Sequence, residues 1–114
     1  MLDGAGHLAV DRALPAKPGV YAFVVGDSAR YVGLATMGLA KRLRFYTRPG
    51  PTQSTSVRLN KVLTNHLAEG EAVTIFTAGP PALSWQGLPV SGEAGLELGL
   101  IQTFHLPWNI RGAR

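Results

Sequence analysis

The sequence GVYAFVVGDSARYVG, residues 19–33, predicts a tight antiparallel β-hairpin with a tyrosine near each end. Residues 19–25 are mostly β-branched or aromatic, which is the composition that strands favour. The residues GDS at 26–28 provide turn chemistry, and residues 30–35 can then return beside the first strand. We therefore expect the two tyrosines to be held on one short piece of sheet.

Two helices are predicted to follow the hairpin. Leucine and tyrosine side chains recur at helical spacing in residues 39–46, and the Pro-Gly-Pro at 49–51 ends this short helix. A second helix begins after capping residues at 52–56 and stops at Gly70. The first of these helices is cationic on its outer side.

A third strand and a last helix complete the pattern. Residues 72–78, AVTIFTA, have the composition of a strand, and a Pro- and Gly-rich loop follows at 79–89. Ser91 can cap a helix that runs to about Phe104. The order β, β, α, α, β, α predicts an α/β fold, in which a small three-stranded central sheet (the hairpin plus one further strand) is flanked by helices.

The composition indicates one small intracellular domain. At 114 residues, the chain has the length of a single domain, 1–114. It contains no cysteine, which excludes disulfides and cysteine-based zinc sites and favours a reducing, cytoplasmic location. The longest wholly apolar run, residues 20–25, is far shorter than the roughly 20 residues of a membrane span. We therefore expect no membrane partner and no separate recognition domain.

The positive charge is concentrated in one part of the chain. Eleven lysines and arginines against seven acids give a formal charge of +4. Between positions 41 and 61 the chain has cations and no acid: Lys41, Arg42, Arg44, Arg48, Arg58 and Lys61. Such a basic block is typical of a surface that binds a polyanion. A solvated helix face is an almost equally good explanation of the charge alone.

Two charged residues border apolar helix faces. Glu97 has Leu100 and Ile101 among its neighbours at helical spacing, and Arg42 has Leu39 and Phe45. A carboxylate in such a place must be paired, hydrogen-bonded or bound to a metal. Arginine suits bidentate phosphate contact. A structural ion pair for the glutamate and a snorkelling arginine are the alternative readings.

Four motifs in order resemble the GIY-YIG nuclease family. GVY at 19–21 and YVG at 31–33 resemble its two half-motifs, and GLAKRLRFY at 38–46 resembles its arginine-containing helix. LELGLI at 96–101, followed by PWN at 107–109, resembles its closing glutamate and asparagine pattern. The resemblance therefore extends from Gly19 to Asn109.

The resemblance implies a role for each matching residue. The catalytic set would be Tyr21, Tyr31, Arg42, Tyr46 and Glu97, with Glu97 as the metal ligand. Gly33 and Asn109 would brace the site. One extra residue precedes the arginine helix, so Lys41 competes with Arg42 for the phosphate, and the spacing to Tyr46 favours Arg42. The residues expected to contact nucleic-acid backbone are Lys41, Arg44, Arg48, Arg58 and Lys61.

The implied activity is a metal-dependent DNA endonuclease that acts on duplex or branched DNA. A single glutamate would hold one Mg2+ or Mn2+ weakly, which suits an ion recruited together with the substrate phosphate. Tyr21 would act as a base only if its pKa fell by about 3 units, and otherwise would only orient the water. The basic block also fits a non-catalytic nucleic-acid-binding module, and a protein-interaction domain is a third possibility. Trp85 is expected to pin its loop rather than stack on a base.

Overall fold

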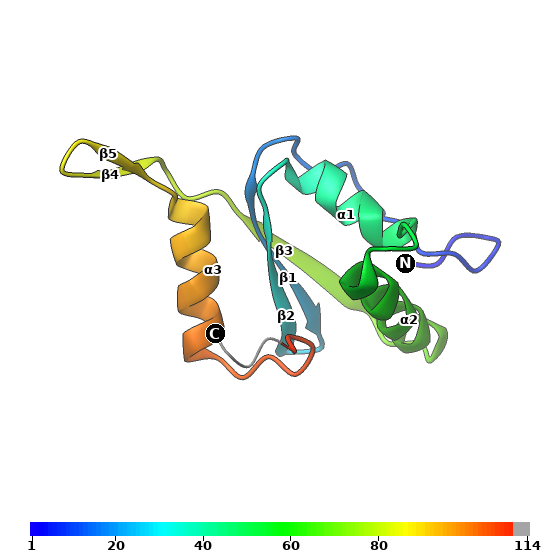
Figure 1. Ribbon diagram of the computed structural model, residues 1–114. Coiled ribbons are helices and arrows are strands. Elements are labelled where there is room, and N and C mark those ends of the chain that lie inside the picture. Colours follow the sequence, from blue (N-terminus) through cyan, green and yellow to red (C-terminus); the bar gives the residue numbers. More distant parts are fainter. Residues whose placement is uncertain (111–114) are drawn as a thin grey trace.

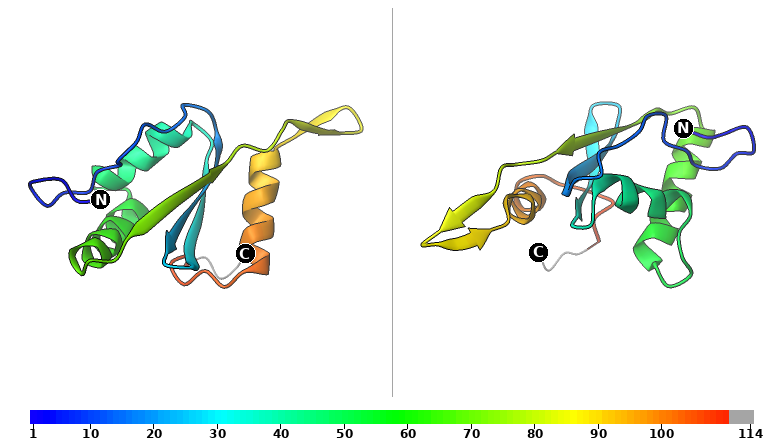
Figure 2. Two further views of the ribbon diagram at one scale, coloured as in Figure 1. Left: turned by 180° about the vertical axis from the view of Figure 1, so that it is seen from behind. Right: turned by 90° about the horizontal axis from the view of Figure 1, so that it is seen from above.

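The computed structural model describes residues 1–110 and has an α/β architecture in three layers (Figure 1). In chain order its elements are β1 (Gly19–Val25), β2 (Ser28–Ala35), α1 (Leu39–Thr47), α2 (Ser54–Ala68), β3 (Val73–Ala78), β4 (Leu83–Trp85), β5 (Leu88–Val90) and α3 (Gly92–Thr103). The main sheet is antiparallel with the order β2-β1-β3. Helices α1 and α2 lie on one face of it and α3 on the other (Figure 2). The predicted fold class is confirmed.

The register of the β1–β2 hairpin places both of its tyrosines on the same face. Tyr21 pairs with Gly33 and Phe23 pairs with Tyr31, so the two tyrosines are diagonal neighbours. Side chains on a strand alternate between faces, and this set points toward α1 and α2. The ring centroids of Tyr21 and Tyr31 are 6.2 Å apart.

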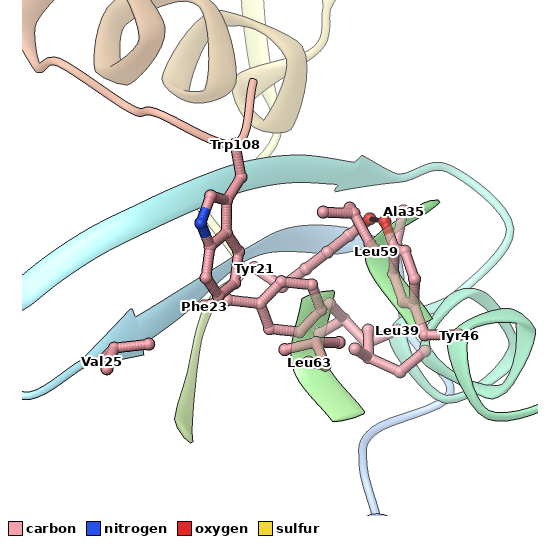
Figure 3. Close-up of a cluster of buried hydrophobic side chains, with 10 residues drawn as sticks. Tyr21, Phe23, Val25, Ala35, Leu39, Tyr46, Leu59, Leu63 and Trp108 are labelled. Carbon is pink, nitrogen blue, oxygen red and sulfur yellow. Dashed lines mark hydrogen bonds between the residues drawn. The ribbon is translucent and has the colours of Figure 1, made fainter. Parts of the chain in front are cut away.

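The main core lies between this face and the first two helices (Figure 3). Tyr21 and Phe23 of β1 pack against Leu43 and Tyr46 of α1 and against Leu59 of α2, and all five are almost fully buried. Burial of each such side chain stabilises the fold by about 1.5–3 kcal/mol. The ring of Phe23 meets the ring of Tyr46 edge-on at 5.2 Å. The core therefore fixes the phenol rings as part of its own packing.

The opposite face of the sheet carries a smaller cluster beneath α3. Its buried members are Val20, Val32 and Leu106, and Leu96 and Leu100 of α3 pack against them. This contact holds α3 against the sheet and sets the position of Glu97, the second of the two glutamates on the helix. Within residues 1–110, no helix is both long and apolar enough to cross a membrane.

The prediction of a loop at 79–89 is wrong in part, because a second hairpin forms within this segment. Strands β4 and β5 pair through a two-residue turn, in which Gln86 and Gly87 both have positive φ angles of 52° and 77°. Positive φ at both positions is the geometry of the type I′ turn that suits a two-residue hairpin. Trp85 is 66% exposed, so it does not pin this segment to the body.

Candidate functional site

The phenol groups of Tyr21 and Tyr46 meet inside the core. Their hydroxyl oxygens are 2.5 Å apart and share one hydrogen bond, which joins β1 to α1 (Figure 3). Tyr31, on β2, is only partly buried and lies beside Tyr21 on the side toward solvent. The three tyrosines expected in the site are thus close together, but only Tyr31 has substantial exposure.

Arg42 joins this cluster from α1. Its guanidinium carbon lies 4.6 Å from the centre of the Tyr46 ring, and its Nη1 donates a hydrogen bond to Ser56 Oγ at 3.0 Å. Ser56 is buried in the first turn of α2, so it holds the guanidinium in one orientation. Lys41, the alternative to Arg42, is exposed on the same helix. The sequence presented Ser56 only as one of several capping residues.

Glu97 lies in a cleft at the outer edge of β2. The cleft has a volume of about 470 Å³ and is lined by Tyr31, Val32, Ser54, Thr55, Arg58, Glu97, Asn109 and Ile110. The Glu97 side chain comes from α3 and is mostly buried. Tyr31 lines the cleft and also contacts Tyr21, so it connects the tyrosine cluster to Glu97. Tyr21, Arg42 and Tyr46 do not line this cleft.

The predicted nucleic-acid contacts divide between two places. Arg58 lines the cleft with Glu97, and its Nη2 donates to the Trp108 carbonyl oxygen at 2.9 Å. Arg44 and Arg48 line a separate cleft of about 650 Å³ beside the N-terminal segment. Lys61 is exposed further along α2. Arg58 therefore shares its cleft with the expected metal ligand, whereas Arg44, Arg48 and Lys61 do not line that cleft.

Asn109 completes the edge of β2 as another strand would. Its Nδ2 donates to the Val32 carbonyl oxygen and its Oδ1 accepts from the Val32 amide, each at 3.0 Å. The amide of Trp108 also donates to the Arg30 carbonyl oxygen at 2.8 Å. These bonds hold the segment after α3 against β2, and with it one wall of the cleft.

Gly33 leaves room for the Tyr21 ring. A Cβ atom at position 33 would lie 2.4 Å from both Cζ and Oη of Tyr21, far inside van der Waals contact. We expect Gly33→Ala to destabilise the protein by about 1–3 kcal/mol, because the buried ring has nowhere to move. Urea unfolding followed by circular dichroism measures this loss.

A matched glycine and a double variant test the cause of that loss. Gly99 lies in α3, where an added Cβ meets nothing within 4 Å. Gly99→Ala should therefore stabilise the protein by about 0.5–1 kcal/mol through its helix propensity. In a Tyr21→Leu background, Gly33→Ala should cost clearly less than it does alone. An equal cost in both backgrounds would contradict the clash with Tyr21.

Burial raises the pKa of both core tyrosines above the ordinary value of 10.0. Desolvation of the phenolate is the largest cause for each. For Tyr21 the neighbouring Tyr31 adds to the rise, while the positive charge of Arg42 opposes it. The raised pKa keeps Tyr21 protonated at neutral pH in the free protein, so its hydroxyl can donate a hydrogen bond.

These raised pKa values predict a loss of stability in alkali. Unfolded tyrosines ionise near pH 10, whereas the folded ones hold their protons to higher pH. Their contribution is complete below about pH 10 and is lost as the pH rises toward the folded values. The free energy of unfolding should decline above about pH 10, and the decline should be shallower in Tyr46→Phe. Identical pH slopes in the two proteins would contradict this prediction.

Glu97 is the one carboxylate among the described residues that line the cleft. In residues 1–110, no group of three or more His, Asp or Glu side chains is arranged to hold a metal. Mg2+ needs no such cage, because it commonly binds one or two carboxylates and completes its shell with water and substrate phosphate. The mostly buried Glu97 at the cleft wall fits that mode.

Comparisons with known proteins support the fold. No protein-family model matches the sequence, and no curated protein matches it. Among solved structures, the chain is similar to a mutant of EndoII from bacteriophage T4, with a TM-score of 0.77 and 23% sequence identity. The similarity covers 96% of this chain and 86% of that one. At this identity the likeness establishes a shared fold.

Proposed function

We propose that the protein is a metal-dependent DNA endonuclease of the GIY-YIG type. The observation that carries this proposal is the cleft lined by Glu97, Tyr31 and Arg58, together with Arg42, whose partner Ser56 follows the cleft residues Ser54 and Thr55 on α2. The fold shared with EndoII of bacteriophage T4 supports a nuclease activity. DNA is the substrate that this class and the basic block between positions 41 and 61 indicate together.

Each side chain has a task in phosphodiester hydrolysis. Arg42 would neutralise charge that builds on the non-bridging oxygens, and its bond to Ser56 keeps the guanidinium oriented before substrate arrives. Tyr31 would hydrogen-bond to the attacking water or to the phosphate from the cleft wall. Tyr21 and Tyr46 would hold Tyr31 and Arg42 in place from the core.

Glu97 would hold one Mg2+ or Mn2+ ion at this site. When bound, the ion would supply positive charge to the phosphate and lower the pKa of nearby water. Arg58 lies in the same cleft, so its guanidinium would bind a phosphate next to the one that is cut. One carboxylate and one further cation are consistent with a one-metal mechanism.

A non-catalytic DNA-binding module is the second candidate, and one observation favours it. The hydroxyl groups of Tyr21 and Tyr46 are buried and bond to each other, so neither reaches a phosphate without a movement of the core. The endonuclease and the binding module would make the same DNA contacts, but only the endonuclease would cleave the DNA.

Conversion of supercoiled plasmid to nicked and linear forms tests the proposal. We expect cleavage by the purified protein with Mg2+, and none in the presence of a chelator that removes the ion. Duplex, flap and four-way-junction oligonucleotides extend the assay to branched substrates. Tight, salt-dependent binding without cleavage of any of these, with Mg2+ or Mn2+, would exclude the enzyme and favour the binding module.

A further inference from the structure

The β4–β5 hairpin extends away from the body of the protein and buries none of its own side chains. It projects outward from the start of α3 (Figures 1 and 2). Every residue of both strands is exposed, including the large apolar side chains Leu83, Trp85, Leu88 and Val90. An exposed apolar group of this size on a small protein indicates an interaction surface.

The base of the hairpin is firmly seated, so the hairpin projects in a defined direction. Gly92, the first residue of α3, is buried, and a Cβ there would lie 2.8 Å from the Pro81 carbonyl oxygen and 3.3 Å from Pro80 Cβ. The diproline therefore packs directly on the start of the helix. This contact between the two prolines and Gly92 fixes the base of the hairpin to α3.

The distribution of charge argues against DNA as the partner of this surface. The sequence has no lysine or arginine from position 62 to position 110, and no charged residue at all from 79 to 92. Nucleic-acid binding draws its affinity from cations that neutralise phosphates. The partner is therefore expected to be a protein surface that is apolar and uncharged.

The same chain carries a surface of that kind. A groove of about 340 Å³ runs between the sheet and α3, and the described residues that line it include a single charged one, Asp27. Phe76 of β3 and Phe104 at the end of α3 line it and are 60% and 58% exposed. The outer edge of β3 pairs with no strand among residues 1–110, whereas the β2 edge is covered by Asn109.

We propose that two copies of this chain form a dimer, in which the β4–β5 hairpin of each copy lies in the groove between β3 and α3 of the other. The exposed parts of Phe76, Trp85 and Phe104 would contribute roughly 300–450 Å² per copy. The exposed parts of Leu83, Leu88 and Val90 add to this area, and the roughly 800 Å² per partner of a standard interface sets the scale. Because each copy places its hairpin in the groove of the other about a two-fold axis, both grooves are filled and the assembly stops at two copies.

The first test measures the mass of the protein without DNA or metal, so its result is independent of the proposed function. Light scattering after size exclusion should give twice the chain mass for wild type and a concentration-dependent shift to monomer for Trp85→Ser/Leu88→Ser. Met37→Ser is the matched control, because Met37 is equally exposed at 66% and lies outside the hairpin. A monomeric wild type, or a dimer that survives the double substitution, would overturn the proposal.

Cross-linking identifies the surface that the hairpin occupies. Because the chain has no cysteine, a disulfide can form only between introduced residues. Trp85→Cys mixed with Phe104→Cys should give a linked dimer under mild oxidation, while each variant alone should not. Efficient linkage of Trp85→Cys to itself would mean that hairpins pack on each other and would overturn docking in the groove. Loss of DNA affinity in Trp85→Ser/Leu88→Ser without a change of mass would likewise reject the dimer and place the hairpin on DNA.

Discussion

Glu97→Gln is expected to reduce Mg2+-dependent DNA cleavage by about 1,000-fold, equivalent to roughly 4 kcal/mol of transition-state stabilisation. Glu97 is the only carboxylate among the described residues lining the cleft, so the substitution removes the proposed metal ligand. Glutamine has nearly the same shape, which keeps the packing of α3 on the sheet. Rates of plasmid nicking across a Mg2+ titration, with melting temperature measured in parallel, check both parts of this expectation.

A second glutamate on the same helix provides the control. Glu93 lies in the first turn of α3, where its carboxylate accepts a hydrogen bond from Ser91 Oγ at 3.1 Å. Glu93→Gln changes the net charge by the same amount and should leave the cleavage rate nearly unchanged. Its expected cost is about 0.3–1 kcal/mol of stability, from the lost interaction with the helix dipole. If Glu97→Gln cut DNA as fast as Glu93→Gln, the assignment of Glu97 as metal ligand would fail.

The fold was predictable because local pattern and tertiary packing agree over most of the chain. Tyr21, Phe23 and Val25 alternate on β1, and all three are buried on the face that α1 and α2 cover. Leu43 and Tyr46 recur on α1 at the spacing that turns them toward the same face. Where local pattern and packing agree in this way, the spacing of apolar residues predicts whether a segment is a strand or a helix.

The β4–β5 hairpin was missed because it lacks that agreement. Neither strand buries a face, each has three residues, and Pro89 breaks the composition that strands favour. Its turn is Gln86-Gly87, whereas Asn-Gly and Asp-Gly are the strong hairpin signals. When every residue of a strand is exposed, as in β4 and β5, the sequence has no reason to alternate between apolar and polar residues.

The sequence motifs named the residues of the candidate site but could not describe the contacts around them. The motifs pointed to Tyr21 and Tyr46, but their mutual hydrogen bond links positions 25 residues apart and depends on how α1 packs on the sheet. The contact between Arg42 and Ser56 is likewise long-range, because a proline-containing turn separates the two helices. Contacts of this kind leave no local periodicity.

Arg42→Ala is expected to lower kcat by about 100- to 1,000-fold with little change in KM, because its charge acts mainly on the transition state. Arg42→Lys should recover only a small part of this loss, since an ammonium group cannot reproduce a planar fork that bonds to Ser56 and would also bind a phosphate. Ser56→Ala should give an intermediate loss, because the guanidinium keeps its charge and its place near the Tyr46 ring but loses its hydrogen-bonded orientation.

Steady-state cleavage of a labelled duplex gives kcat and KM for each of these variants and so tests the predicted losses. Lys17→Ala removes one exposed positive charge outside the site and controls for the general effect of charge on DNA affinity. A drop in affinity alone would appear in KM and would shrink at low salt, whereas loss of an oriented charge persists at saturating DNA. An Arg42→Ala protein that matched Lys17→Ala in kcat would remove Arg42 from the chemistry and leave it as a surface contact. If a buried serine preorganises the arginine, kcat should be lowest for Arg42→Ala, higher for Arg42→Lys and highest for Ser56→Ala.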